Sequence, residues 1–160
     1  IGGQATAMAK EFMGLDIFAS KLHKLAVILK PHGVNLVELL TNESSETLIR
    51  DSVTAKFVST TAFQVILTEI LVQDLEVLPE VILGHSFGEI AAAYAQGYIS
   101  AEEAVLISYN RGQVLEQARK EIPIGLMAAV GQSFNDASDM CPKNVFVACN
   151  NAPKLVTLSG

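Results

Sequence analysis

Apolar residues recur at intervals of three and four along much of this chain, a spacing that is typical of helices with one buried face. The pattern predicts helices over 6–18, 18–29, 56–73, 89–94, 100–119 and 133–140. The helix over 56–73 is apolar on most of its surface, so we expect it to be buried. The polar segment 42–51 is expected to be an exposed connection.

Short unbroken apolar runs predict strands. Val81-Ile82-Leu83 follows Pro79 and is typical of a strand covered on both faces. Three further strands are expected over 127–130, 145–148 and 155–158. With the helix over 133–140 they give the order β-α-β-β, which is the beginning of a small α+β unit.

Turn-forming and helix-capping residues support these boundaries. His32-Gly33 is typical of a turn after the second helix. Gly97 stands where the residue after a helix C-terminus belongs. Ser100 and Glu103 form a capping-box pattern, which predicts that a helix begins there.

Composition narrows the class of protein. The chain has 160 residues, 50% of them hydrophobic and 18% charged, which excludes disorder. A net charge of −6 argues against nucleic-acid binding, because no basic surface is available. The charge-free stretch 122–135 is too short for a membrane span, and the N-terminus lacks a signal-peptide pattern. Cys141 and Cys149 have no disulfide or metal spacing, so no metal site is expected.

The most informative motif is Gly84-x-Ser86-x-Gly88, which lies between the predicted strand at 81–83 and a predicted helix. This is the pattern of a nucleophile elbow, a sharp turn that exposes a serine hydroxyl. Glycines at both flanks leave room for the turn. We interpret Ser86 as a nucleophile; a structural turn serine is the alternative.

The elbow also predicts an oxyanion site. The N–H of Phe87 would be the first donor, and the following helix N-terminus favours negative charge. The Phe87 side chain is expected to form a pocket wall, and Glu89 to compensate the helix dipole. His85 adjoins Ser86 and is expected to be structural or orienting near the pocket. His23 and His32 are expected to be solvated, so the chain offers no convincing base for Ser86.

Arg111 is the second informative residue. It lies in the helix that Ser100 opens, close to its apolar stripe. An arginine there needs an anionic partner, because an unpaired buried charge is costly. That partner is either an internal carboxylate, in a salt bridge, or the carboxylate of a substrate. Spacing alone leaves both readings open.

Together these motifs resemble the acyltransferase domains of fatty acid and polyketide synthases. The resemblance is carried by Gly84-His85-Ser86-Phe87-Gly88-Glu89, Tyr109-x-Arg111-Gly112 and Val156-Thr157-Leu158-Ser159-Gly160. Further stretches resemble the malonyl/acetyltransferase of animal-type fatty acid synthase: Leu29-Lys30-Pro31-His32-Gly33, Phe57-Val58-Ser59, Glu103-Ala104-Val105-Leu106 and Met127-Ala128-Ala129-Val130-Gly131. The resemblance covers essentially the whole chain.

The resemblance implies an α/β fold in two parts. Residues 1–124 would form an incomplete hydrolase-like subdomain with a parallel sheet and the nucleophile elbow. Residues 125–160 would begin a ferredoxin-like α+β subdomain, truncated here. The family's catalytic histidine lies in a later segment that this sequence does not contain, so these residues alone are expected to be inactive and marginally stable.

The resemblance also assigns site residues. Ser86 would be the acylated nucleophile, and Arg111 would bind the malonyl carboxylate. Ile1 would supply the second oxyanion N–H, with Gln4 beside it, and Asn151 would lie at the subdomain junction. The N-terminal loop departs from the family pattern at Gly3, Ala5 and Ala7.

The expected activity is transfer of malonyl or acetyl from coenzyme A to the phosphopantetheine arm of acyl carrier protein, through an acyl-serine, in fatty acid biosynthesis. No bound cofactor is expected. Expected partners are acyl carrier protein, coenzyme A thioesters and other domains of a cytoplasmic, homodimeric synthase. The alternatives are a polyketide synthase acyltransferase, a serine hydrolase or thioesterase, and a non-catalytic scaffold module.

Overall fold

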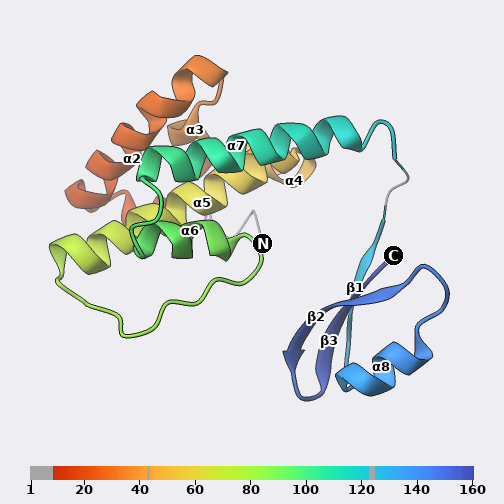
Figure 1. Cartoon of the computed structure of the whole chain (residues 1–160). Coiled ribbons are helices and arrows are strands. Elements are labelled where there is room, and N and C mark those ends of the chain that lie inside the picture. The colour runs from red at the N-terminus through yellow and green to blue at the C-terminus, as the bar shows by residue number, and fades with distance from the viewer. Residues whose placement is uncertain (1–8, 43, 123–124) are drawn as a thin grey trace. The chain divides into compact units, whose positions relative to one another are not determined.

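A computed structural model of the chain describes residues 9–42, 44–122 and 125–160 (Figure 1). The chain divides into two compact units, Ile1–Lys120 and Glu121–Gly160, and each is described by itself. The functional division expected after residue 124 stays a prediction, because compactness does not assign a role to either part.

The first unit is built from helices around a central one. Its elements are α2 (Asp16–Leu29), η1 (Lys30–His32), α3 (Leu36–Thr41), α4 (Ser45–Asp51), α5 (Val53–Glu69), the π-helical segment η2 (Ile70–Asp74), α6 (Gly88–Ala95) and α7 (Ala101–Ala118). Helix α5 packs against α2, α6 and α7, and Figure 1 shows it running beneath α7 with α6 at its side. Its buried face includes Val58, Ala62 and Ile66, which confirms the expected buried helix.

The helix ends follow the sequence signals closely. Gly33 and Gly97 both adopt positive φ, 75° and 77°, which glycine allows without strain. After α6, the N–H groups of Gly97 and Tyr98 donate to the carbonyls of Tyr94 and Ala93, as in a Schellman motif. The capping box of Ser100 and Glu103 is present at the start of α7. These boundaries are confirmed.

Two helix predictions need correction. The segment 42–51 is not simply an exposed connection, because α4 occupies most of it and Ile49 is fully buried beside Leu39 and Ala55. A single buried apolar side chain in a polar segment leaves no periodic pattern of hydrophobic residues. The helix expected over 6–18 is interrupted in its described part: the chain turns around Gly14, a poor helix former, and α2 begins at Asp16.

The strand expected at Val81-Ile82-Leu83 is wrong for the described structure. This segment is non-helical, and the side chains of Val81 and Leu83 are 73% and 89% exposed. A strand needs a neighbour to satisfy its backbone hydrogen bonds, and no described segment pairs with this one. The described residues of the first unit therefore do not form the expected parallel sheet.

The second unit contains a three-stranded antiparallel sheet with one helix. Its elements are β1 (Met127–Val130), α8 (Phe134–Met140), β2 (Phe146–Ala152) and β3 (Leu155–Ser159). The strand order is β1-β3-β2, so β1 and β2 flank β3 as in a split β-α-β arrangement. Helix α8 packs on β2 and β3 and buries Ala137, and Val156 of β3 is also fully buried. The expected β-α-β-β order is confirmed.

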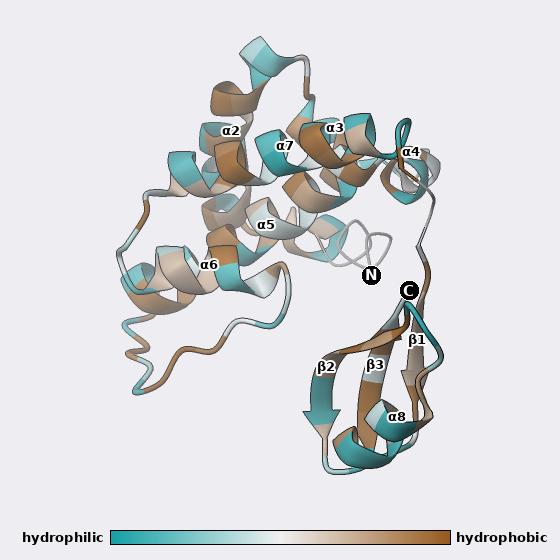
Figure 2. Ribbon diagram, turned by 45° about the vertical axis from the view of Figure 1, so that its right-hand side comes forward, coloured by the Kyte–Doolittle hydropathy of each residue, from teal (hydrophilic) through white to brown (hydrophobic). Residues whose placement is uncertain are grey.

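Hydropathy also marks the core of the first unit. Figure 2 shows apolar stretches on α2 and α6, and the buried cluster joins α2, α3, α5, α6 and α7. Among the described residues, Val53–Asp74 is long and apolar enough to cross a membrane by length and composition. A buried core helix passes the same test, and this one packs against neighbouring helices. The expectation of no membrane span stays a prediction.

A carboxylate from α7 caps the start of α5. Glu116 Oε1 accepts hydrogen bonds from Ser52 Oγ at 2.6 Å and from the Thr54 N–H at 2.9 Å. Burial alone would raise the pKa of Glu116, but these hydrogen bonds outweigh it and lower the pKa. The ionised carboxylate therefore holds the two longest helices together at this end.

We expect Glu116→Gln to destabilise the chain by roughly 1–2 kcal/mol at pH 7, because charged hydrogen bonds at a helix N-terminus are lost. The lowered pKa means that this contribution is present above the unfolded pKa of Glu, about 4.3, and is lost as pH falls through the folded value. Urea unfolding from pH 3 to 7 measures it. Glu80→Gln, on an exposed carboxylate, is the control; an equal loss from both variants contradicts the capping role.

Candidate active site

Ser86 occupies a strained turn at the start of α6. Its φ is 55°, in the left-handed region that non-glycine residues rarely adopt. The turn is closed by hydrogen bonds from the Gly88 N–H to the His85 carbonyl at 2.9 Å and from the Glu89 N–H to the Ser86 carbonyl at 3.2 Å. The Ser86 side chain is exposed. These are the features expected of a nucleophile elbow.

The two glycines of the motif differ in how much space surrounds them. A Cβ on Gly84 would lie 2.5 Å from Glu89 Cα and 2.6 Å from its nitrogen, so the backbone before the serine touches the first turn of α6. A Cβ on Gly88 would meet no described atom within 4 Å. The expectation that both glycines make room for the turn is therefore confirmed only for Gly84.

The backbone amide of Phe87 is available to a ligand. Within the described part of the chain it donates no hydrogen bond, while the N–H groups of Gly88, Glu89 and Ile90 are all used in the turn. It lies directly before α6, where the helix dipole favours negative charge. A free amide next to an exposed serine hydroxyl has the composition of half an oxyanion hole.

No histidine among the described residues forms a hydrogen bond with Ser86. His85 is exposed and makes no hydrogen bond to the serine. His23 contacts the carbonyl of Ala19 through Nδ1 at 2.7 Å, and the ring of His32 lies 4.8 Å from that of Tyr109. A general base is therefore not found in the part of the chain that the structure describes.

Arg111 lies beside the elbow. Its guanidinium carbon is 4.9 Å from the centre of the Phe87 ring, a cation–π distance. The side chain is exposed and forms no ion pair with any described residue. Of the two readings of Arg111, the internal salt bridge therefore finds no support in the described residues.

The position of Arg111 follows from close helix packing that sequence analysis did not identify. Its neighbour Gly112 faces α5, where an added Cβ would lie 2.5 Å from Thr54 Cα. One turn earlier, Ser108 Oγ donates to Thr61 Oγ1 at 2.7 Å. Small residues thus let α7 approach α5 and fix the helix that carries Arg111. The spacing of Ser108 and Gly112 is the sequence signal of this contact.

Phe57 is a further residue that sequence reasoning missed. Its ring centroid lies 3.5 Å from that of Phe87, so Phe87 contacts both Phe57 and Arg111. In the sequence Phe57 is one of many apolar residues of a buried helix, and its place in a stretch that carries the family resemblance assigned it no role in the site. Phe87 is half-buried, and its role as a pocket wall stays a prediction.

The remaining predicted site residues belong to the second unit or lie outside the described residues. Ile1 and Gln4 fall outside the described residues. Asn151 is in β2 of the second unit, exposed, and its Nδ2 donates to Thr157 Oγ1 at 2.9 Å. No cluster of three metal-ligating side chains occurs among the described residues, and Cys141 and Cys149 are free.

Three cavities of the first unit that are bounded by described residues have neither Ser86 nor Arg111 in their walls. One of about 400 Å³ is bounded by His32, Tyr109 and Glu116 among others, and neither Ser86 nor Arg111 lines it. Ser86 instead lies on the open surface. Among the described residues, Ser86 and Arg111 are thus both exposed, and Phe87 is half-buried.

Comparison with known proteins places the chain in a family. The whole chain, residues 1–160, matches the acyl transferase domain family. It is 36% identical over 171 residues to the highly reducing polyketide synthase PKS6 of Gibberella zeae, covering 99% of this chain and 7% of the relative. It is 43% identical over 127 residues to the synthase acrA of Aspergillus aculeatus, covering 72% of this chain and 5% of the relative.

Solved structures agree on the fold. The acyltransferase domain from the second module of the salinomycin polyketide synthase is 29% identical, with a TM-score of 0.76 over 94% of this chain and 34% of that one. The acyl-carrier-protein S-malonyltransferase of Burkholderia pseudomallei has a TM-score of 0.79 at 22% identity, over 93% of this chain and 48% of that one. The chain thus spans less than half the length of both solved neighbours. It has the mixed α/β fold of these proteins, and it belongs to the acyltransferase domain family that polyketide synthase domains and malonyl transacylases share.

Proposed function

We propose that this chain is the acyltransferase domain of a multidomain synthase and that it transfers malonyl or acetyl groups from coenzyme A to acyl carrier protein. One observation carries the proposal: Ser86 is exposed at a strained elbow, next to the free amide of Phe87, whose ring lies beneath Arg111. A nucleophile, an oxyanion donor and a cation for a carboxylate are thus close together.

Transfer would take place in two steps. The Ser86 hydroxyl attacks the thioester carbonyl and gives its proton to a general base, which we propose to be a histidine of the longer synthase. The Phe87 N–H stabilises the oxyanion, the carbon–sulfur bond breaks, and coenzyme A leaves as the protonated thiol. The thiol of the carrier's phosphopantetheine arm then attacks the acyl-serine ester and regenerates the hydroxyl. No bound cofactor takes part.

The type of parent synthase is proposed from the relatives. The first relatives are named highly reducing polyketide synthases, which supports a polyketide-type parent. Animal-type fatty acid synthase is the second candidate, favoured by stretches such as Phe57-Val58-Ser59 and Leu29-Lys30-Pro31-His32-Gly33. Product analysis of the full-length protein with malonyl-CoA and NADPH separates the two, since a fatty acid synthase releases fully reduced chains.

The proposed partners and location follow from that setting. A solved neighbour is described as a malonyl transacylase in complex with its acyl carrier protein, at a TM-score of 0.77 and 20% identity. We propose a carrier protein, coenzyme A thioesters and other synthase domains as partners here, in a cytoplasmic homodimer. Neither nucleic acid nor a membrane is a proposed partner, because the chain is acidic and its most apolar helix is packed.

The direct test is intact-mass measurement of the full-length protein after mixing with malonyl-CoA. We expect a malonyl adduct on the peptide that contains Ser86, and its transfer to added carrier protein. No adduct at Ser86 would refute the proposal. If the adduct is lost to water with no carrier acylation, the protein is a serine hydrolase or thioesterase. A protein that binds carrier without any adduct would be a scaffold module.

Arg111→Ala should reduce malonyl transfer about 100-fold while acetyl transfer changes less than about threefold, because only malonyl offers a carboxylate to the guanidinium. Initial rates with malonyl-CoA and acetyl-CoA measure this difference. Arg119→Ala, which removes an exposed arginine at the end of the same helix, is the matched control. Equal losses with both substrates would instead assign Arg111 a structural role.

A further inference from the structure

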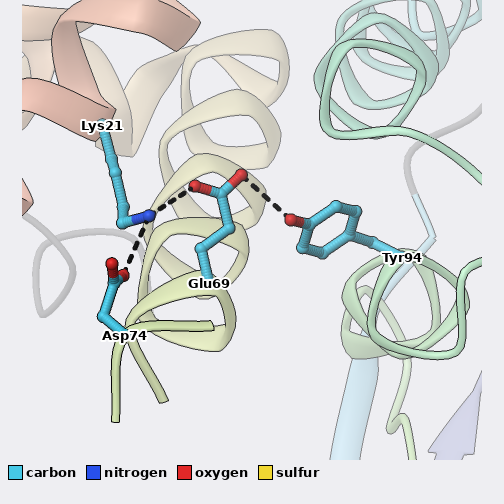
Figure 3. A network of polar contacts seen from close by, with 4 residues as sticks. All are labelled: Lys21, Glu69, Asp74 and Tyr94. Carbon is cyan, nitrogen blue, oxygen red and sulfur yellow. Dashed lines mark hydrogen bonds and ion pairs between the residues drawn. The ribbon is translucent and has the colours of Figure 1, made fainter. Parts of the chain in front are cut away.

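A partly buried polar network joins the end of the elbow helix α6 to the rest of the first unit (Figure 3). Lys21 Nζ of α2 lies 3.2 Å from Glu69 Oε2 and 2.9 Å from Asp74 Oδ2. The other oxygen of Glu69 accepts a hydrogen bond from the Tyr94 hydroxyl at 2.9 Å. Tyr94 belongs to α6, so the network joins four elements: α2, α5, η2 and α6.

The network is only partly open to solvent at its centre. The side chains of Lys21 and Glu69 are 11% and 19% exposed, and that of Asp74 is 31% exposed. Burial alone would lower the pKa of Lys21, but hydrogen bonds to Asp74 and Glu69 outweigh it and raise the pKa. Burial and the bond to Glu69 raise the pKa of Tyr94 well above its usual range. Charged hydrogen bonds in such surroundings hold their partners more firmly than exposed ones.

The π-helical segment η2 explains why the network forms here. Residues Ile70–Asp74 widen the end of α5, and the N–H of Leu75 donates to the carbonyl of Ile70 across the wider turn. Asp74, at the end of this segment, reaches the same lysine as Glu69. Lys21 therefore fixes both sides of the π segment, and Glu69 is held in one position to receive Tyr94.

Helix α6 connects this network to the nucleophile. The helix has eight residues, so it is about 12 Å long and only two turns separate its ends. Its first turn lies against the backbone of Gly84, where there is no room even for a Cβ. A tilt or slide of α6 cannot be absorbed at this contact, so it would move Ser86 and the Phe87 amide.

We infer that Glu69 is a positioning residue for the Ser86 nucleophile, acting through its hydrogen bond to Tyr94 at the opposite end of the elbow helix. This inference rests on the proposed acyltransfer, which supplies its readout. Lys21 and Asp74 hold Glu69 in place, and none of these residues touches the substrate. The network sets the geometry of attack rather than the affinity for acyl-CoA.

The test is rapid-quench measurement of acyl-Ser86 formation by the full-length protein at saturating malonyl-CoA. Tyr94→Phe removes one hydroxyl and should lower the burst rate constant about 10-fold, since small displacements of reacting groups have effects of this size. The burst amplitude and the KM for malonyl-CoA should stay within twofold of the original values, on the order of experimental scatter. Tyr98→Phe, at an exposed tyrosine four residues later, should change neither quantity.

Three results would overturn the inference. A Tyr94→Phe burst with the original rate constant and a reduced amplitude means that the contact only keeps the protein folded. An unchanged rate and amplitude mean that the contact is dispensable. Glu69→Gln is the second variant: it should slow the burst as well, and the double variant should be no slower than the slower single one. Additive losses contradict action through one contact.

The two proposals fail in different ways. If the unaltered protein forms no adduct at Ser86, the proposed function is wrong, whatever the network does. If it forms the adduct and Tyr94→Phe does so equally fast, only the positioning role of Glu69 is wrong.

Discussion

Ser86→Ala should lower carrier acylation by about 10⁴-fold or more, because no hydroxyl is then present to form the acyl-serine ester. The effect on folding should be small. The hydroxyl is exposed and makes no hydrogen bond with a described residue, so the free energy of unfolding should change by less than about 0.5 kcal/mol. Intact mass with malonyl-CoA and urea unfolding measure the two quantities separately.

Ser86→Gly sharpens this prediction. Ser86 has a φ of 55°, a conformation that glycine adopts freely. We therefore expect Ser86→Gly to be as inactive as the alanine variant and more stable than the unaltered chain by roughly 1 kcal/mol. A glycine variant of unchanged or lower stability would show that the turn stores no strain at this position. An active alanine variant would refute the nucleophile assignment.

Local sequence signals were sufficient where a residue and its partner are close in the chain. The capping box of Ser100 and Glu103, the Gly97 turn and the elbow at Ser86 all depend on contacts within a few residues. The burial of α5 was also predictable, because its apolar surface extends around the helix. In each case the energetic reason lies in the segment itself.

Strand pairing was not predictable in this way. The pattern of Val81-Ile82-Leu83 describes side chains that favour burial, but a strand is defined by its neighbour, and no described segment fills that role. Ile49 shows the opposite case: it is buried in a polar segment because Leu39 and Ala55 come to it from other helices. Both depend on contacts between separate elements.

The residues of the candidate site also differ in whether local sequence signals identify them. Ser86, Phe87 and Arg111 are found from motif spacing, whereas Phe57 enters only through the packing of α5 near the elbow. The network around Glu69 leaves no periodic pattern in the sequence, since Lys21 and Tyr94 lie 48 and 25 residues from Glu69. Lys21 has the sequence context of an ordinary surface lysine. Its burial follows from the π segment, which a helical pattern through residue 73 conceals.

Gly84→Ala and Gly88→Ala should change the free energy of unfolding in opposite directions, although each adds the same methyl group. At Gly84 the new methyl group would lie 2.5 Å from Glu89 Cα and 2.7 Å from the Gly88 carbonyl oxygen. These are backbone atoms of α6, so the helix must move and the turn must open. We expect a destabilisation of about 2–4 kcal/mol, in the range of overpacking and backbone strain, and loss of acylation at Ser86.

At Gly88 no described atom lies within 4 Å of the new methyl group, and the residue begins α6 with helical geometry. Replacing glycine by alanine in a helix restricts the unfolded chain, so Gly88→Ala should stabilise the protein by up to about 1 kcal/mol. Urea unfolding of the two variants side by side measures the contrast. Equal destabilisation would mean that the motif needs both glycines for the fold. If Gly88→Ala is stable but does not acylate Ser86, the second glycine instead leaves space for the substrate.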